Sequence, residues 1–209
     1  ASASWSNLGT VTLSDGQGIL SALRHRINVT TPVSATGIRL ITPGSGAASG
    51  AAVDEIEIYS TPGAVVPLPP GIVTTGSPGY SIAWDGNDGD NFSAAAIAPD
   101  NLARPGNGGT AIGSGSLGPQ IGVPFHVIAN LNDGLYGNSN SWIGGDGDPA
   151  PYHAGIMLNG LHEITTIAFG RDNGLDAAGG DCCGGQARDR NLGTYTLQRT
   201  LDGSSWETI

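Results

Sequence analysis

Few residues of this sequence could do chemistry, and their spacing argues against catalysis. The histidines are scattered, at His25, His126, His153 and His162. Glu163 follows His162, but no second histidine stands at the spacing of a zinc-peptidase helix. The adjacent carboxylates of Asp54 and Glu55 would point to opposite faces of a strand and could not share a proton. There is no nucleophile-elbow motif, so we expect a protein that is not an enzyme.

Three other polar groupings have structural explanations. Cys182 and Cys183 are adjacent and cannot make a zinc site alone, which leaves a vicinal disulfide, bridges to neighbouring chains or two free thiols open. A loop disulfide without catalysis is our preferred interpretation. The acidic run Asp85–Asp90 looks like a calcium loop but lacks the twelfth-position glutamate of an EF-hand, so we interpret it as a turn. Asn28 and Asn91 begin two sequons, which are possible glycan acceptors or chance triplets.

Composition narrows the class of protein. Acidic residues outnumber basic ones by 18 to 8, giving a formal charge of -10, which argues against nucleic acid as a partner. The same balance suits Ca²⁺ or a neutral ligand. No apolar stretch approaches the ~20 residues of a membrane span. With no recognisable signal peptide, the sequence is typical of a mature secreted protein, so we expect an extracellular or cell-surface location.

The apolar pattern predicts an all-β fold. The 35 glycines and 13 prolines separate short runs rich in Val, Ile and Thr. We expect strands over 8–13, 25–31, 36–42, 53–59, 155–159, 163–169 and 194–200. The alternation of isoleucine with acidic residues over 53–59 predicts a half-buried strand. Short strands with long Gly-rich loops favour an antiparallel β-sandwich or jelly roll.

Several motifs then resemble one family. Asp133-Gly134-Leu135-Tyr136, ahead of Trp142, looks like an Asp-Gly-x-Tyr…Trp entry loop. Residues 156–160 and 164–172 resemble a central hairpin, and 195–198 with 202–206 a strand and turn. Residues 36–40 and 53–59 look like two closing strands. Together these motifs are similar to the discoidin, or coagulation factor 5/8 type C, family of galactose-binding-like jelly rolls.

The order of these motifs is circularly shifted. Residues 1–60 match the C-terminal half of the family pattern, 101–209 match its N-terminal half, and 61–100 form a Pro/Gly-rich connector. The chain could be a circular permutant, a slice through tandem domains, or a subunit whose leading strands complete its neighbour. The start Ser4-Trp5-Ser6-Asn7-Leu8 repeats the pattern of Ser205–Ile209, which disfavours a simple permutant. We therefore expect each half of the sandwich to be completed by an adjacent copy.

The resemblance also implies ligands. A structural Ca²⁺ would be held by Asp133, the backbone oxygen of Leu135, Asn138 and Glu55, although Asp133 and Asn138 could instead satisfy turn backbone. Sugar binding in the family uses loop aromatics with polar partners at one end of the sandwich. The candidates by residue type are Trp142, Tyr152, His126, His153 and Arg171. Trp142 fits a core position better, and Arg171 fits a structural pair with Asp172.

These expectations favour an architectural function. We predict a repeating unit of an extracellular filament or long adhesin, assembled head to tail from copies of itself. The alternative is a secreted carbohydrate-binding module of a larger cell-surface protein, with cell-surface or matrix glycans as partners. An appendage to a hydrolase is a third, weaker possibility.

Overall fold

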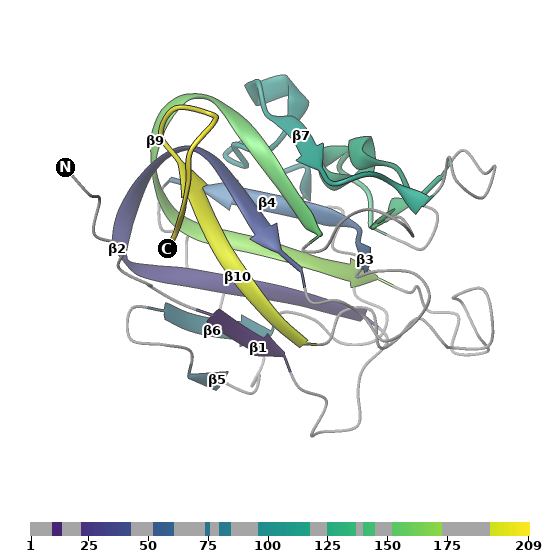
Figure 1. Cartoon of the computed structure of the whole chain (residues 1–209), viewed down its shortest axis with the longest axis horizontal. Helices are drawn as coiled ribbons and strands as arrows, with labels where there is room; N and C mark the ends of the chain where they lie inside the picture. The colour runs from purple at the N-terminus through teal and green to yellow at the C-terminus, as the bar shows by residue number, and fades with distance from the viewer. Residues whose placement is uncertain are drawn as a thin grey trace.

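The protein is described by a computed structural model. It describes residues 10–13, 22–42, 52–60, 74–75, 80–84, 96–117, 125–136, 140–144, 152–172 and 193–209. This part of the chain is all-β apart from short helical turns (Figure 1). Within these ranges, no helix is long and apolar enough to cross a membrane.

Most strands are short, but two are long. The strands are β1 (Thr10–Leu13), β2 (Ala22–Ile41), β3 (Ala52–Val53), β4 (Glu55–Tyr59), β5 (Thr74–Thr75), β6 (Tyr80–Trp84), β7 (Thr110–Gly113), β8 (Trp142–Ile143), β9 (His153–Asp172), β10 (Gly193–Thr200) and β11 (Trp206–Thr208). Two 3-10 turns, η1 (Pro105–Asn107) and η2 (Ile128–Asn132), flank β7. Among the described residues, nine strands form one antiparallel sheet, and β3 pairs separately with β8.

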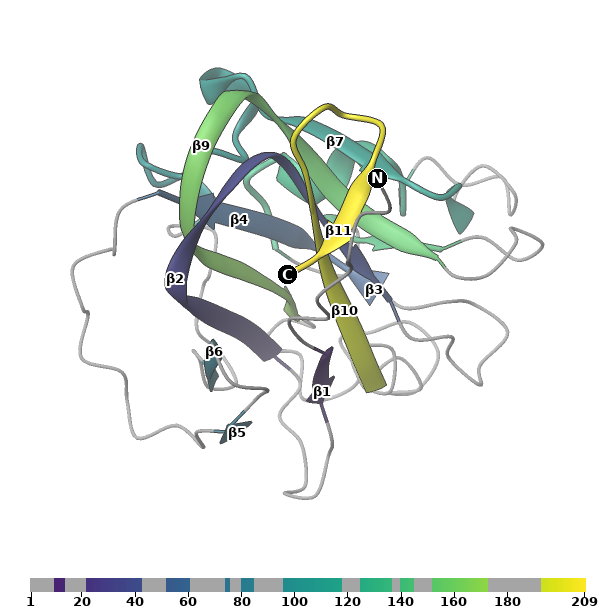
Figure 2. The same ribbon diagram turned by 60° about the vertical axis from the view of Figure 1, so that its left-hand side comes forward.

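The strands β2 and β9 organise the sheet because they pair with each other along almost their whole length. Both bend strongly, so the sheet curls (Figures 1 and 2). The pairing of β2 with β9 shifts register between Asn28 and Val33, around the exposed Pro32. Proline has no N–H to donate, so an irregularity in the ladder is where it is tolerated. The sequence predicts two strands in each region, 25–31 and 36–42 in β2 and 155–159 and 163–169 in β9, whereas the structure has one continuous bent strand in each.

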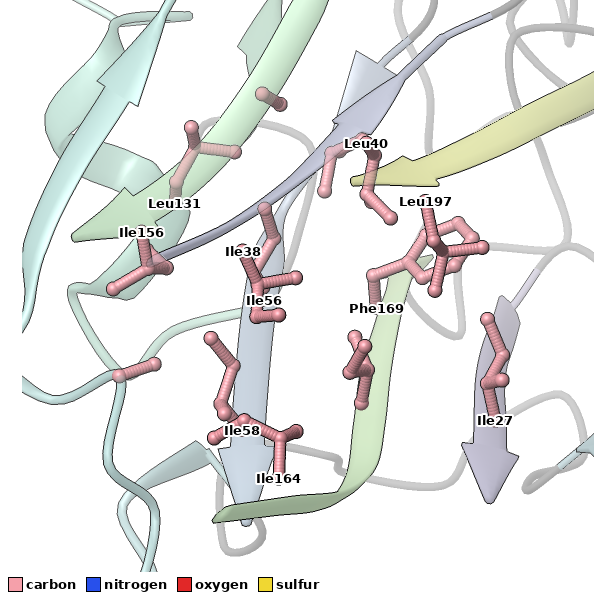
Figure 3. Close-up of a cluster of buried hydrophobic side chains, with 14 of the residues drawn as sticks. Ile27, Ile38, Leu40, Ile56, Ile58, Leu131, Ile156, Ile164, Phe169 and Leu197 are labelled. Atoms are coloured by element: carbon pink, nitrogen blue, oxygen red, sulfur yellow. The ribbon is translucent and has the colours of Figure 1, made fainter. Parts of the chain in front are cut away.

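The curl encloses the main apolar cluster of the described residues. Beyond the bend, β2 pairs with β10, whereas its first half pairs with β6. Side chains from both halves of the sheet pack in one cluster, including Ile27 and Phe169 from one half and Leu40 and Leu197 from the other (Figure 3). The apolar residues that alternate along the strands therefore point into the core from both halves of the sheet.

The two segments that we assigned to separate half-domains form one sheet within this chain. From the segment 1–60, β2 pairs with β9 and β10, and β4 pairs with β9. The expectation that each half must be completed by an adjacent copy is therefore corrected. Backbone groups of the two halves satisfy one another in the same chain.

The connector assigned to 61–100 also contributes to the sheet. Within it, β6 pairs with β2 from His25–Trp84 to Val29–Tyr80, and β5 pairs with β6. Residue 96 begins a described segment that packs against β4, since the Leu102 N–H donates to the Ile58 carbonyl (2.8 Å). Part of the segment 61–100 therefore adds strands β5 and β6 to one edge of the sheet.

Candidate metal site

The strand β4 places two carboxylates in the protein interior. Ile56 and Ile58 point into the apolar core, so Glu55 and Glu57 lie on the other side of the strand. The alternating pattern predicts that this side is solvent-exposed, and that prediction is wrong. All five residues of β4 are buried, because residues from distant parts of the chain cover both sides of the strand.

Glu57 is held by two tyrosines. The hydroxyl of Tyr136 donates to Glu57 Oε1 (2.8 Å), and the hydroxyl of Tyr59 donates to Oε2. Both hydroxyls are neutral donors, so they solvate the buried carboxyl group without adding charge. Tyr136 also ties the segment 133–136 to β4.

Glu55 is less completely solvated. Its Oε2 accepts a hydrogen bond from the Gly134 N–H (3.0 Å), while Oε1 has no hydrogen-bond partner among the described residues. The side chain is 0% exposed. Burial raises the pKa of Glu55 to about 9, opposed by the hydrogen bond from Gly134. The negative charges of Asp133, Glu57 and Asp54 raise this pKa further.

Gly134 can reach Glu55 because of its backbone conformation. Its φ is +86°, a region that residues with a Cβ rarely adopt. A Cβ there would also lie 2.8 Å from Ile97 Cγ2. The glycine of the Asp-Gly-x-Tyr motif is thus required for the turn that aims its N–H at the carboxylate.

Asp133 lies at the outer side of this corner. Its Oδ1 accepts the Leu135 N–H (2.8 Å), closing a turn of the kind that aspartate often makes. The surrounding protein displaces part of the water around this carboxylate and raises the pKa of Asp133 to about 6, although the bond from Leu135 opposes the shift. Asp133 and Leu135 are exposed, whereas Glu55 is buried, and the two carboxyl groups are close enough for the charge of Asp133 to raise the pKa of Glu55.

The donor set fits a hard cation. An orphaned carboxylate oxygen on Glu55, the carboxylate of Asp133 and the backbone oxygen of Leu135 are the ligand types that Ca²⁺ prefers. A cation would offset the burial that raises both pKa values and the carboxylate repulsion that adds to the shift at Glu55. In the part of the chain that the structure describes, no three His, Cys, Asp or Glu side chains group to hold a metal, so the site would depend on backbone oxygens. Asn138 lies outside the described residues.

Two of the candidate sugar-binding side chains, Trp142 and His126, are buried within the described part of the chain. Trp142 is fully buried, and its Nε1–H donates to the Gly115 carbonyl (2.8 Å), as expected for a core residue. His126 is buried, with Nδ1 3.0 Å from Ser141 Oγ. Tyr152 packs against the apolar core. Burial, and then the charge of Arg39, lower the pKa of His153.

Several further predictions fall where the structure gives no test. Asn91, the acidic run 85–90, Cys182 and Cys183 lie outside the described residues, as does the side chain of Arg171. Asn28 lies in β2 with strands on both sides, and its Oδ1 accepts a bond from Thr166 Oγ1 (3.2 Å).

A second feature, which the sequence did not predict, is the outer edge of β10. On the side of β10 away from β2, β11 pairs with residues 198–200, and β1 pairs with residues 193–196 (Figure 2). The Ile209 N–H donates to the Leu197 carbonyl (2.9 Å), and Thr10 faces Thr196. One edge strand is thus made of two segments from opposite ends of the sequence.

The sequence held a signal for this edge. Ser205–Ile209 and Ser4–Leu8 share a Ser-Trp-x-x-aliphatic pattern; the first segment contains β11, which pairs with β10, and the second lies outside the described residues, shortly before β1 in the sequence. On β11, Trp206 lies under the guanidinium of Arg39, with Arg39 Cζ 4.4 Å from the ring centroid. Ile209 is 1% exposed and belongs to the core.

Comparisons with known proteins add no relative: no family model matches the chain, and no curated protein or solved structure matches it. The discoidin resemblance therefore depends on the motifs named above.

Proposed function

We propose that this chain is a structural unit of an extracellular assembly, joined head to tail to copies of itself. Its curled sheet would be a discoidin-like two-layered sandwich. The observation that carries the proposal is the edge of β10, where β11 and β1 follow each other on successive rungs. An edge strand built of two short pieces is a natural place for exchange between copies.

The proposal differs from the sequence-based expectation in what is exchanged. Because the large halves pair within the chain, a neighbour need not supply half a sandwich. What can be shared at low cost is the short edge strand, since β1 and β11 pair only with β10 among the described residues. Adding a strand to such an edge is a common mode of protein association.

A structural Ca²⁺ is the second part of the proposal. Glu55 belongs to β4, whereas Asp133 and Leu135 belong to a segment far along the sequence, so an ion bound to all three would fix the two segments together. The support is Glu55 Oε1, which is buried and has no hydrogen-bond partner among the described residues, together with the effect of the Asp133 charge on the pKa of Glu55. A cation there would supply a positive countercharge to the buried carboxylate of Glu55.

Thermal melting tests the ion. Ca²⁺ at about a hundred times its dissociation constant should stabilise the fold by about 2.7 kcal/mol relative to EDTA. The same stabilisation should be lost in Glu55→Gln and retained in Glu163→Gln, whose side chain is exposed. Identical melting of the wild type in EDTA and in calcium would exclude a structural calcium site.

Sedimentation velocity over a range of protein concentrations tests the assembly. The proposal predicts species larger than a monomer that grow with concentration. The competing interpretation is a circular permutant that closes on itself, for which a single monomeric species is expected at every concentration. Observing only that monomer would contradict the proposed function.

A further inference from the structure

The dipeptide Asn-Gly occurs twice in the described part of the chain, at Asn107-Gly108 and at Asn159-Gly160, and once outside it, at 173–174. In such a dipeptide the backbone nitrogen of the glycine can attack the side-chain amide carbon of the asparagine, because the glycine has no side chain to block the approach. Asn107 and Asn159 are both exposed, so access to solvent does not distinguish them. Their hydrogen bonds, in contrast, differ.

Asn107 is held away from this reaction. Its Nδ2 donates to the Asn101 carbonyl (2.7 Å) and to the Pro99 carbonyl (3.0 Å). The Gly108 nitrogen, which would have to attack, donates its hydrogen to the Pro105 carbonyl (2.9 Å). The reaction at Asn107 must therefore break three hydrogen bonds that the fold provides.

Asn159 lacks these restraints. Its side-chain amide makes no hydrogen bond among the described residues. The ladder between β9 and β2 skips from Met157–Gly37 to His162–Ala35, and that between β9 and β7 ends at Met157, so residues 158–161 belong to neither pairing. Gly160 has a φ of +97°, and nothing lies within 4 Å of the place where a Cβ would stand. The reacting groups are thus free to approach each other.

His162 contacts the peptide group that has to react. Its Nε2 lies 3.2 Å from the Asn159 carbonyl oxygen, and because a carbonyl only accepts, the ring nitrogen is the donor of this bond. The Asn159 carbonyl and the Gly160 N–H form one peptide group. When this N–H loses its proton, the negative charge spreads onto the carbonyl oxygen, where the hydrogen bond from His162 stabilises it. The contact therefore favours formation of the attacking nitrogen.

We propose that Asn159 is a site of spontaneous covalent modification, at which the Gly160 nitrogen attacks Asn159 Cγ with the help of His162. The bond between this nitrogen and Cγ forms, and the bond between Cγ and Nδ2 breaks. The Nδ2 group leaves as ammonia, taking up the proton that the Gly160 nitrogen releases, and a cyclic succinimide remains. Water then opens the ring at one of its two carbonyl groups and gives aspartate or isoaspartate. No group is oxidised or reduced, and either product adds one negative charge to this exposed part of β9.

Peptide mapping by tandem mass spectrometry tests the proposal, on the full chain incubated at mildly alkaline pH. An isoaspartyl methyltransferase with a labelled methyl donor detects the isoaspartate independently. In the folded protein Asn159 should convert at least about tenfold faster than Asn107, which has three hydrogen bonds to break. The two sites share one environment, since a Cβ on Gly108 would lie 2.5 Å from Asn159 Cβ. In urea, where the fold is lost, the two rates should become similar.

His162→Ala tests the part assigned to the histidine. It should slow conversion at Asn159 roughly threefold or more, because one hydrogen bond to the reacting peptide group is lost. Asn107 is the internal control, since a loosened fold would speed conversion there, and thermal melting verifies that the variant is folded.

Equal rates at Asn107 and Asn159 in the folded wild type would overturn the proposal. A difference that persists unchanged in urea would also overturn it, because the fold would then not be its cause. An unchanged rate at Asn159 in folded His162→Ala would overturn the assistance by His162. The wild-type comparison of folded with urea-unfolded protein decides the proposal even if His162→Ala does not fold.

Discussion

Replacing Glu55 by glutamine should remove a pH dependence of stability that the wild type shows without metal. In the folded protein the pKa of Glu55 is raised to about 9, against an ordinary value of 4.5. The folded state therefore binds a proton that the unfolded state has released. The stability associated with this proton is fully present below about pH 4.5 and is lost as pH rises through about 9.

The size of the effect follows from the linkage between protonation and folding. Between the two pKa values, each pH unit lowers the free energy of unfolding by about 1.4 kcal/mol. From pH 7.0 to 8.5 the wild type should therefore lose about 2 kcal/mol, which corresponds to roughly 4–8 °C in Tm for a chain of this length. This window lies above the raised pKa of Asp133, about 6, so that group adds little.

The assay is thermal unfolding followed by circular dichroism, in EDTA at constant ionic strength. Glu55→Gln should show a nearly flat Tm over this window. Its absolute stability is not the readout, because the new amide NH₂ would be buried in place of the unpartnered Oε1 and would cost about 1–3 kcal/mol at every pH. Glu163→Gln changes an exposed side chain and should keep the wild-type slope.

Parallel pH profiles for the wild type and Glu55→Gln would refute the reasoning. They would mean that the carboxyl group of Glu55 titrates with the same pKa in the folded and unfolded states. Burial and the neighbouring carboxylates would then not disfavour the ionised form of Glu55, and the electrostatic argument for a cation would be lost.

Two further predictions concern packing. Gly109→Ala should destabilise the fold by roughly 1–3 kcal/mol or more, because the new Cβ would lie 2.0 Å from the Ala103 carbonyl oxygen. Gly106→Ala is the matched control in the same segment, since nothing lies within 4 Å of its Cβ, and urea unfolding should place it within about 0.5 kcal/mol of the wild type. Trp142→Phe should cost roughly 1–3 kcal/mol by the same assay, because it leaves the Gly115 carbonyl without its indole donor; an unchanged midpoint would show that this bond contributes nothing.

The sequence predicted the positions of the strands better than it predicted which distant residues cover them. The alternation of acidic and apolar residues over Glu55–Tyr59 predicted the strand β4, but it did not predict that β4 is buried on both sides. That burial comes from Leu102, which bonds the β4 backbone, and from Gly134 and Tyr136, which cover its carboxylates. These residues lie far from β4 in sequence, and a local pattern carries no information about which distant segment will cover a strand.

The bends of β2 and β9 were hard to predict for a related reason. Pro32 interrupts the apolar pattern and favours a break between two strands. In the structure the strand continues past this residue because β9 lies beside β2 on both sides of the irregularity, from Asn28 and from Val33 onward. Tertiary pairing thus overrides the local signal.

The candidate metal corner could be predicted only in part. The resemblance to discoidin domains placed Glu55 beside the Asp133 turn, and the structure brings the two together through the Gly134 N–H. It gave no indication of Glu57 or of its two tyrosine donors. The shared edge of β10 was missed because it depends on register, which only the paired strands reveal.

Electron microscopy of the native material tests the central claim most directly. If the chain is a head-to-tail structural unit, the images should show filaments or linear strings of regularly spaced domains, each the size of one curled sheet. Dispersed single particles of one domain, at concentrations where the native material is intact, would contradict the account.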